Sequence, residues 1–342
     1  MPALGSLLNI EPEMNTMQQQ FLILENELFN SNFLQSLLNR LKPASDTSAS
    51  KAIADFNGIL KKNDWRSNFL INLLLQVFCL WDLRLVILLH AWKKKNQHRF
   101  HDWFAVIAEM EVTISYASLV YNEPEWCFPL VDEKYFHLEA NEIGHPLIPA
   151  GTRITNDFLL AGIGKVALVT GSNMAGKSTF LRSLGVNTVL ALTGGPVCAR
   201  KMHLSDVKLI SSMRVSDNLA ENTSTFYAEL KKMQRIIEWV NRKERIFILL
   251  DEVLRGTNSL DRHKGSKALV RQLLQSGSVA LMATHDTDLA HSESANPSVY
   301  NYHFEGKILN DELSFDYKIK KGISESLNAT TLMKRIGIHF ED

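Results

Sequence analysis

Residues 171–179 constrain the fold of this chain more than any other segment. They read Gly-Ser-Asn-Met-Ala-Gly-Lys-Ser-Thr, which fits the phosphate-loop pattern G-x-x-x-x-G-K-[ST]. Residues 166–170 before the loop are an apolar run suited to a buried strand, and a helical pattern starts at Phe180. A strand, a glycine-bounded loop and a helix N-terminus direct several N–H groups and a helix dipole to one point. The alternative is a strand-to-helix turn that binds nothing, and the agreement between loop and flanks disfavours it.

The loop predicts roles for individual residues in a nucleotide site. Backbone N–H groups from Asn173 to Thr179 would surround the phosphates, and Lys177 would reach the β- and γ-phosphates. The Ser178 hydroxyl would ligate Mg²⁺. The predicted nucleotide-binding residues of the loop are Gly171, Ser172, Asn173, Met174, Ala175, Gly176, Lys177, Ser178 and Thr179.

Two later strand patterns end in residues that suit the same chemistry. Residues 246–250 are an apolar run followed by Asp251 and Glu252, and residues 279–284 lead to His285. Asp251 would hold Mg²⁺ directly or through water, and Glu252 would orient or deprotonate the attacking water. His285, at the carboxyl end of a strand, would hydrogen-bond the γ-phosphate and this water. The simpler alternatives are an acidic pair that caps a helix and a histidine that is an ordinary surface residue.

Composition narrows the possible partners. The 342 residues include 37 Lys or Arg and 37 Asp or Glu, so the formal net charge is zero. This balance argues against a surface that binds nucleic acid throughout, although it allows a local basic stripe. Residues 93–99, Lys-Lys-Lys-Asn-Gln-His-Arg, predict a solvated turn, with contact to DNA phosphates as the alternative.

Cysteine usage and the N-terminal sequence predict a cytoplasmic location. Cys79, Cys127 and Cys198 are widely spaced and form no metal-binding pattern, which favours a reducing compartment. Residues 1–13 lack the basic start and apolar core of a signal peptide.

The pattern of apolar residues divides the chain into two regions. Helical periodicity recurs between residues 15 and 121, whereas strands alternate with helices from Ile154 onward. Short alternating runs between residues 128 and 149 predict edge strands. We therefore expect a smaller all-α region over 1–125 and an α/β domain over 126–342, in which helices flank a mixed sheet.

Residues 69–92 could be mistaken for a membrane span because they are rich in Leu, Ile and Val. Asp82 and Arg84 fall near the centre of this stretch, where each charge would cost roughly 2.5–3.5 kcal/mol in a bilayer. The sequence therefore predicts one long buried helix here rather than membrane contact.

The phosphate loop, the Asp-Glu strand end and the His strand end, in this order, resemble an ABC-type ATPase, and within that class the MutS family of DNA mismatch-repair ATPases. The loop and its sequel, residues 171–182, are similar to that family's version, and Gly195-Pro196-Val197-Cys198-Ala199 resembles its G-x-P-V-P-A segment. Asp217-Asn218-Leu219 with residues 224–230 resembles the family's signature region. Residues 251–261, Ala283-Thr284-His285 and residues 321–329 resemble three further family segments. The resemblance covers residues 128–338 strongly and the helices before them, as lever and core helices, more weakly. It is greatest to the short MutS-like proteins of Bacteroidetes-type bacteria.

The resemblance implies an Mg²⁺-dependent ATPase that couples its nucleotide state to DNA binding. It also implies a homodimer with shared sites, in which Ser224 of one copy caps the γ-phosphate bound by Lys177 of the other. The alternative for Ser224 is that it only caps the helix that follows. DNA would be bound through regions partly outside this chain, because the residues before the ATPase domain are too few for the family's mismatch-reading and connector domains.

Three departures from the family pattern bear on this reading. Asn222 stands where the signature region has glycine, and Ser172 stands where the loop often has proline. Arg153 or Ile154 occupies the place of an aromatic residue that often stacks on adenine, and the Arg153 guanidinium could take over that stacking. A different class of function therefore stays open: an ATP-driven dimeric clamp or scaffold, for recombination or a membrane-proximal partner, without mismatch recognition.

Overall fold

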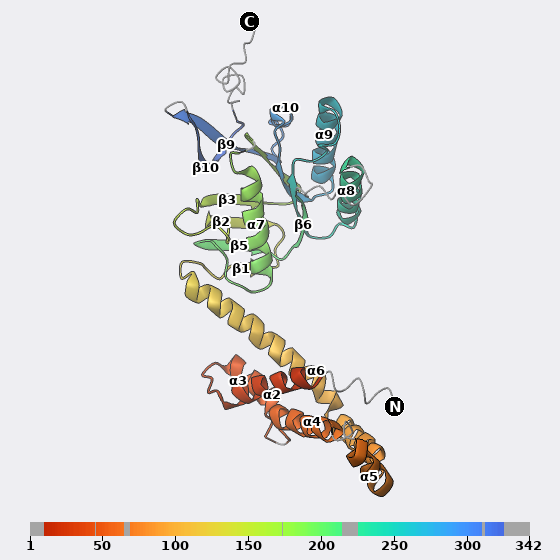
Figure 1. Ribbon diagram of the computed structural model, residues 1–342. Coiled ribbons are helices and arrows are strands. Elements are labelled where there is room, and N and C mark those ends of the chain that lie inside the picture. Colours follow the sequence, from red (N-terminus) through yellow and green to blue (C-terminus); the bar gives the residue numbers. More distant parts are fainter. Residues whose placement is uncertain are drawn as a thin grey trace. The chain divides into compact units, whose positions relative to one another are not determined.

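The computed structural model of the chain describes residues 10–44, 46–64, 69–172, 174–213, 225–309 and 312–324 (Figure 1). These residues form two compact units that divide between Ala117 and Ser118. The division falls inside a helix, a few residues before the boundary expected at 125/126. Each unit has its own hydrophobic core.

In its described residues, the N-terminal unit contains helices and the turns between them, and no strand. Its helices are α2 (Glu11–Asn26), α3 (Asn32–Leu41), α4 (Ala49–Asp64), α5 (Phe69–Cys79) and α6 (Trp81–Asn122). Buried side chains from α2, α3, α4 and α6 meet in one core, with Phe21, Ile53 and Trp103 fully enclosed. Arg40 donates hydrogen bonds to Asp102 and Glu109, which ties α3 to α6.

Helix α6 corrects two predictions. Residues 93–99 lie within this 42-residue helix, so the predicted basic turn is wrong. Lysine, arginine and glutamine are good helix formers, and a run of them does not interrupt a helix that core contacts hold on both sides.

The predicted long buried helix over residues 69–92 is also wrong. Leu80, with φ of 46°, separates α5 from α6, and most of the large apolar side chains between residues 73 and 88 are exposed. By length and composition alone α6 could cross a membrane. Only 17% of the 18-residue apolar stretch that meets this test is buried. We call the exposed large apolar residues of this region the α5/α6 apolar face: Leu73, Leu74, Val77, Phe78, Leu80, Leu83, Val86, Ile87 and Leu88.

The C-terminal unit contains two sheets in the described residues. The six-stranded sheet has the order β10-β9-β4-β8-β7-β6 and is parallel except for β10. Its strands are β4 (Lys165–Thr170), β6 (Lys208–Ser212), β7 (Ile246–Asp251), β8 (Val279–Ala283), β9 (Val299–Leu309) and β10 (Glu312–Lys321). The four-stranded sheet has the order β1-β5-β2-β3, from β1 (Leu130–Asp132), β2 (His137–Ile143), β3 (Asn156–Ala161) and β5 (Lys201–Ser205). The predicted edge strands thus belong to a separate sheet.

Helices cover both faces of the six-stranded sheet. Helix α7 (Lys177–Leu192) lies between the two sheets, where Leu181 packs in a core shared with Leu138 of β2 and Leu249 of β7 (Figure 1). On the opposite face lie α8 (Thr225–Asn241), α9 (Ser259–Gln275) and α10 (Thr287–Ser292). Alternate residues of β4, β7 and β8 enter each core, which is why these strands read as unbroken apolar runs. The predicted mixed α/β architecture with helices flanking a sheet is confirmed.

Candidate nucleotide site

Three neighbouring strands bring the predicted site residues to one edge of the sheet. β8 lies between β4 and β7, and Ala283 at its end pairs with both Val169 and Asp251. The residues that follow β4, β7 and β8 therefore emerge side by side, at the carboxyl edge where open α/β sheets bind ligands. The described residues of the loop after β4, the pair Asp251–Glu252 and His285 meet there.

Two glycines give the loop its shape. Gly171 has φ of 137°, and a Cβ there would lie 2.6 Å from the carbonyl oxygen of Phe304. Gly176, with φ of 103°, precedes the first residue of α7. Only glycine adopts these conformations without strain. Within the loop Ala175 is buried, whereas Met174 and Thr179 are exposed, and Asn173 lies outside the described residues.

Lys177 is the most buried charged group of the site, with 2% of the residue exposed. Its Nζ donates to the carbonyl oxygens of Gly171 at 2.7 Å and Ser172 at 2.8 Å. Burial lowers the pKa of Lys177 to about 8, although the charges of Glu252 and Asp251 oppose this effect. An added anion would relieve this burial cost, which is the condition that a phosphate-binding lysine needs.

Ser178 and Asp251 provide two adjacent oxygen atoms. The Ser178 hydroxyl donates to Oδ1 of Asp251 at 3.0 Å, and Asp251 is 6% exposed. Two neighbouring ligands of an octahedral Mg²⁺, with bonds of about 2.0–2.1 Å, lie about 3 Å apart. The pair therefore fits two of the ion's positions, with the oxygen chemistry that Mg²⁺ prefers.

Glu252 and His285 are in direct contact. Oε1 of Glu252 lies 2.6 Å from Nε2 of His285, and its other oxygen pairs with Arg255. Burial alone would raise the pKa of Glu252, but the hydrogen bond to His285 and the neighbouring positive charges outweigh it, so this pKa is lowered. Glu252 is thus held as a carboxylate beside an imidazole, the arrangement that can orient a water or take its proton.

Glu229 of α8 contacts the candidate site, and sequence reasoning did not assign it to that site. Its carboxylate accepts the backbone N–H groups of Leu254 at 2.5 Å and Arg255 at 3.1 Å. It therefore fixes the loop that carries Arg255 against Glu252. The signal was its place in the signature-like segment, five residues after Ser224, but nothing local shows that its partner lies beyond β7. Ser224 and Asn222 lie outside the described residues.

Arg153 does not offer an open guanidinium plane. Nε of Arg153 donates to the carbonyl oxygen of Ile148 at 2.8 Å, and the group pairs with Glu123 at 3.4 Å and lies over Trp126. Its side chain is 9% exposed. The stacking role expected from its position in the sequence is therefore not available in this arrangement.

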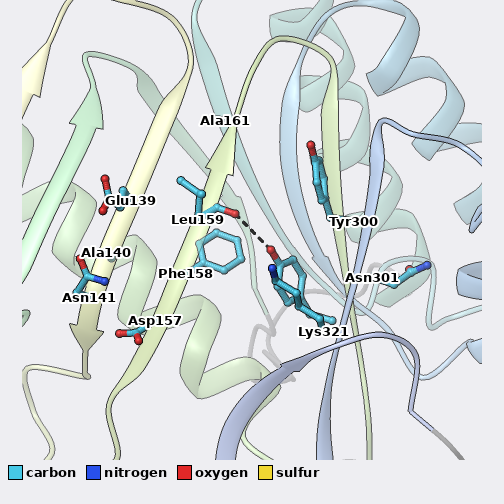
Figure 2. Close-up of a pocket in the computed structure, with 11 residues that line it drawn as sticks. Glu139, Ala140, Asn141, Asp157, Phe158, Leu159, Ala161, Tyr300, Asn301 and Lys321 are labelled. Carbon is cyan, nitrogen blue, oxygen red and sulfur yellow. Dashed lines mark hydrogen bonds between the residues drawn. The ribbon is translucent and has the colours of Figure 1, made fainter.

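A cavity of about 510 Å³ lies elsewhere in the same unit, over β2, β3 and β9 (Figure 2). Phe158, Tyr300 and Lys321 are among the residues that line it. Of the described residues that line it, none belongs to the predicted nucleotide site.

Comparison with known proteins identifies the relatives of this region. Residues 167–337 match the family model for MutS domain V. The DNA mismatch repair protein MutS of Aquifex pyrophilus is 34% identical over 238 residues, which cover 68% of this chain and 27% of that protein. The proteins of the same name from Thermotoga sp. (strain RQ2) and Chlamydia pneumoniae are 30% and 31% identical, over 68% of this chain and 29% and 28% of their own lengths. The chain thus spans less than a third of the curated relatives it matches.

Proposed function

The chain belongs to the MutS family, and we propose from this that it is an Mg²⁺-dependent ATPase that couples its nucleotide state to DNA binding in mismatch repair or a related task. The single observation that best supports the hydrolytic role is the convergence at one sheet edge. Three adjacent strands end at this edge. The segments that follow them carry a buried lysine, a hydroxyl–carboxylate pair and a carboxylate–imidazole pair.

In this proposal each group has a separate task. Lys177 leaves the loop carbonyls and binds the β- and γ-phosphates, which the N–H groups at the start of α7 also contact. Ser178 and Asp251 would hold Mg²⁺, which neutralises charge on the phosphates when it is bound. Glu252 and His285 orient the water in line with the bond that breaks, and Glu252 takes its proton. Phosphoryl transfer needs such positioning and charge neutralisation rather than a covalent intermediate.

The proposal extends to a homodimer and to DNA. By family resemblance Ser224 of a second copy completes the site, so ATP binding and dimerisation are linked. The relatives carry the name DNA mismatch repair protein, and we propose that this protein too binds DNA, in the cytoplasm and through regions partly outside this chain.

Phosphate release at saturating ATP tests the hydrolytic role. Glu252→Gln should keep ATP binding but lower the turnover rate roughly 10²–10⁴-fold, because it removes a positioned base. Glu238→Gln, on the exposed side of α8, is the matched control and should keep the wild-type rate. Turnover within a few-fold of wild type in Glu252→Gln would exclude Glu252 as the hydrolytic carboxylate.

Gel shifts with matched, mismatched and branched DNA, each with and without ATP, test the coupling to DNA. We expect binding that changes with nucleotide and weakens as salt is raised, because phosphate contacts dominate such affinity. ATP turnover with no DNA binding under any of these conditions, even when the regions outside this chain are present, would instead indicate a clamp or scaffold for another partner.

A further inference from the structure

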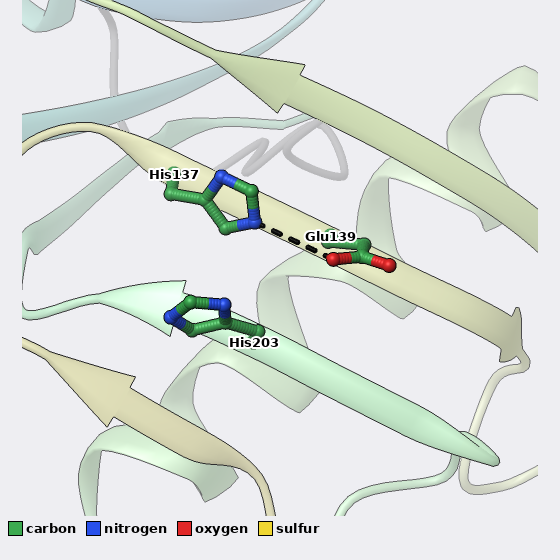
Figure 3. A group of neighbouring side chains, drawn as sticks. All are labelled: His137, Glu139 and His203. Carbon is green, nitrogen blue, oxygen red and sulfur yellow. Dashed lines mark ion pairs between the residues drawn. The ribbon is translucent and has the colours of Figure 1, made fainter.

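One face of the four-stranded sheet carries a cluster of residues of the types that bind metal ions. None of these residues belongs to the candidate nucleotide site. His137 and Glu139 lie two residues apart on β2, so their side chains share one face of the strand. Glu139 pairs directly with His203 of β5 across the antiparallel ladder. Figure 3 shows the three side chains together on this face. The opposite face of the same strands, with Leu138 and Leu204, packs into the core.

The geometry of the cluster is near that of a bound ion. One ligand atom from each of the three residues lies within 4.8 Å of the others. Nε2 of His137 and Oε2 of Glu139 are 3.6 Å apart, longer than a hydrogen bond. In a tetrahedral zinc site, with bonds of about 2.0–2.2 Å, ligand atoms lie about 3.4 Å from each other. Small side-chain rotations would therefore bring all three atoms onto one ion.

His137 leaves a polar atom unsatisfied at this position. Nε2 of His137 is shielded from solvent, and its one polar contact in the described residues is the ion pair with Glu139 at 3.6 Å, which is too long for a hydrogen bond. A buried polar atom without a partner costs free energy comparable to a lost hydrogen bond, so such an atom needs an explanation. A metal ion between His137 and Glu139 would supply the missing interaction.

A second carboxylate orients His203. Oδ2 of Asp132, on β1, lies 3.2 Å from Nε2 of His203. With that nitrogen engaged, Nδ1 is left for an ion. A carboxylate on the far nitrogen of a metal-binding histidine fixes the tautomer and raises the basicity of the ligand.

Lys201 is the one nearby cation in the described residues that contacts the cluster, and it does not block it. Its Nζ lies 3.2 Å from Oε1 of Glu139, whereas Oε2 faces His137. The lysine side chain is 64% exposed, and such surface pairs are weak. Glu139 can therefore bind an ion through one oxygen and keep Lys201 on the other.

We propose that His137, Glu139 and His203 bind a divalent transition-metal ion of the Zn²⁺ type, held between β2 and β5 with Asp132 as the group that orients His203. Two imidazoles and one carboxylate are a ligand set that suits Zn²⁺ and leaves a fourth position for water. The site is independent of the nucleotide site, where oxygen ligands predominate.

Titration of the full chain with Co²⁺, and with Zn²⁺ as competitor, tests this proposal. Excess Mg²⁺ is kept present to occupy the oxygen-rich nucleotide site, since Mg²⁺ does not compete well for imidazole. We expect one Co²⁺ per chain, with the visible absorption of a low-coordinate nitrogen and oxygen site, displaced by Zn²⁺. Zn²⁺ should also raise the melting temperature, because a ligand that binds only the folded state stabilises it.

Variants locate the ion. His203→Ala and the isosteric Glu139→Gln should each lower affinity at least about tenfold, and Asp132→Asn should lower it about 10–100-fold. Lys201→Met should not weaken binding, because it removes a competitor for Glu139. His291→Ala, an exposed histidine on α10, is the control and should bind like wild type.

Circular dichroism checks that each variant is folded. If His203→Ala does not fold, the Co²⁺ affinity of Glu139→Gln decides whether the proposal holds. Co²⁺ uptake that is equal in wild type, Glu139→Gln and His291→Ala would overturn the proposal, and so would no uptake by wild type at micromolar Co²⁺.

Discussion

Replacing Lys177 by methionine is expected to change how the stability of the nucleotide-free protein depends on pH. Burial lowers the pKa of this lysine from 10.5 to about 8. Between these values the unfolded chain holds a proton that the folded chain has released, so wild-type stability rises with pH across this window. Below pH 8 both states are protonated and the full cost of the buried charge is present.

The size of the effect follows from the same pKa values. A fall from 10.5 to about 8 corresponds to about 3 kcal/mol at 1.36 kcal/mol for each pH unit. Methionine has no proton to lose, so the stability of wild type minus that of Lys177→Met should rise by about 3 kcal/mol from pH 7 to pH 10.5. The loss of the hydrogen bonds to Gly171 and Ser172 adds an offset that does not change with pH.

Urea unfolding at a series of pH values, followed by circular dichroism, measures this difference. Two transitions should be fitted if the two units unfold separately. Lys264→Met, at an exposed position on α9, is the control that corrects for general effects of removing a lysine. A difference between wild type and Lys177→Met that stays flat within about 0.5 kcal/mol would refute the argument that burial destabilises this ammonium group.

Other changes test separate parts of the site. Lys177→Ala should abolish ATP binding in calorimetry, and at pH 9 wild type should take up close to one proton with Mg²⁺-ATP, measured in buffers of different ionisation heat. Gly171→Ala should lower the free energy of unfolding by roughly 1–3 kcal/mol, because the added Cβ would lie 2.6 Å from the carbonyl oxygen of Phe304. An unchanged melting temperature would contradict this. Glu229→Gln should lower turnover while ATP affinity stays close to wild type, because the loop that holds Arg255 against Glu252 loses a charged acceptor; equal turnover would remove its positioning role. Mixing Lys177→Ala with Ser224→Arg should recover up to about half of the activity per mixed dimer, and no recovery in dimers confirmed by size exclusion would exclude a shared site.

The part of the fold that could be predicted from the sequence is the part set by short segments. The apolar runs before Gly171, Asp251 and His285 could be read as buried strands, because strands buried on both faces are apolar throughout. Parallel strands place their carboxyl ends at one edge, so the convergence of these residues could be expected without knowing the strand order. Their roles in ATP hydrolysis stay predictions.

The features that could not be predicted depend on contacts between distant segments. Nothing near Glu229 indicates that its carboxylate binds the backbone of Leu254, and His137 and His203 come together only because β2 pairs with β5. The continuity of α6 was missed because a basic run suits a solvated turn as well as a helix. The exposure of most large apolar side chains between residues 73 and 88 was missed because apolar composition does not show which side chains find partners.

The α5/α6 apolar face has a practical consequence for experiments on assembly. Large exposed apolar areas promote association of chains whether or not nucleotide is present. A dimer of the purified chain is therefore not by itself the dimer that shares ATP sites. Association that persists without ATP and is lost in Leu74→Glu or Phe78→Glu occurs through the α5/α6 apolar face. Association that requires Mg²⁺-ATP and is kept in these variants occurs through the candidate nucleotide site. Sedimentation at several protein concentrations, with a low level of mild detergent as a third condition, separates the two before any mixed-dimer result is interpreted.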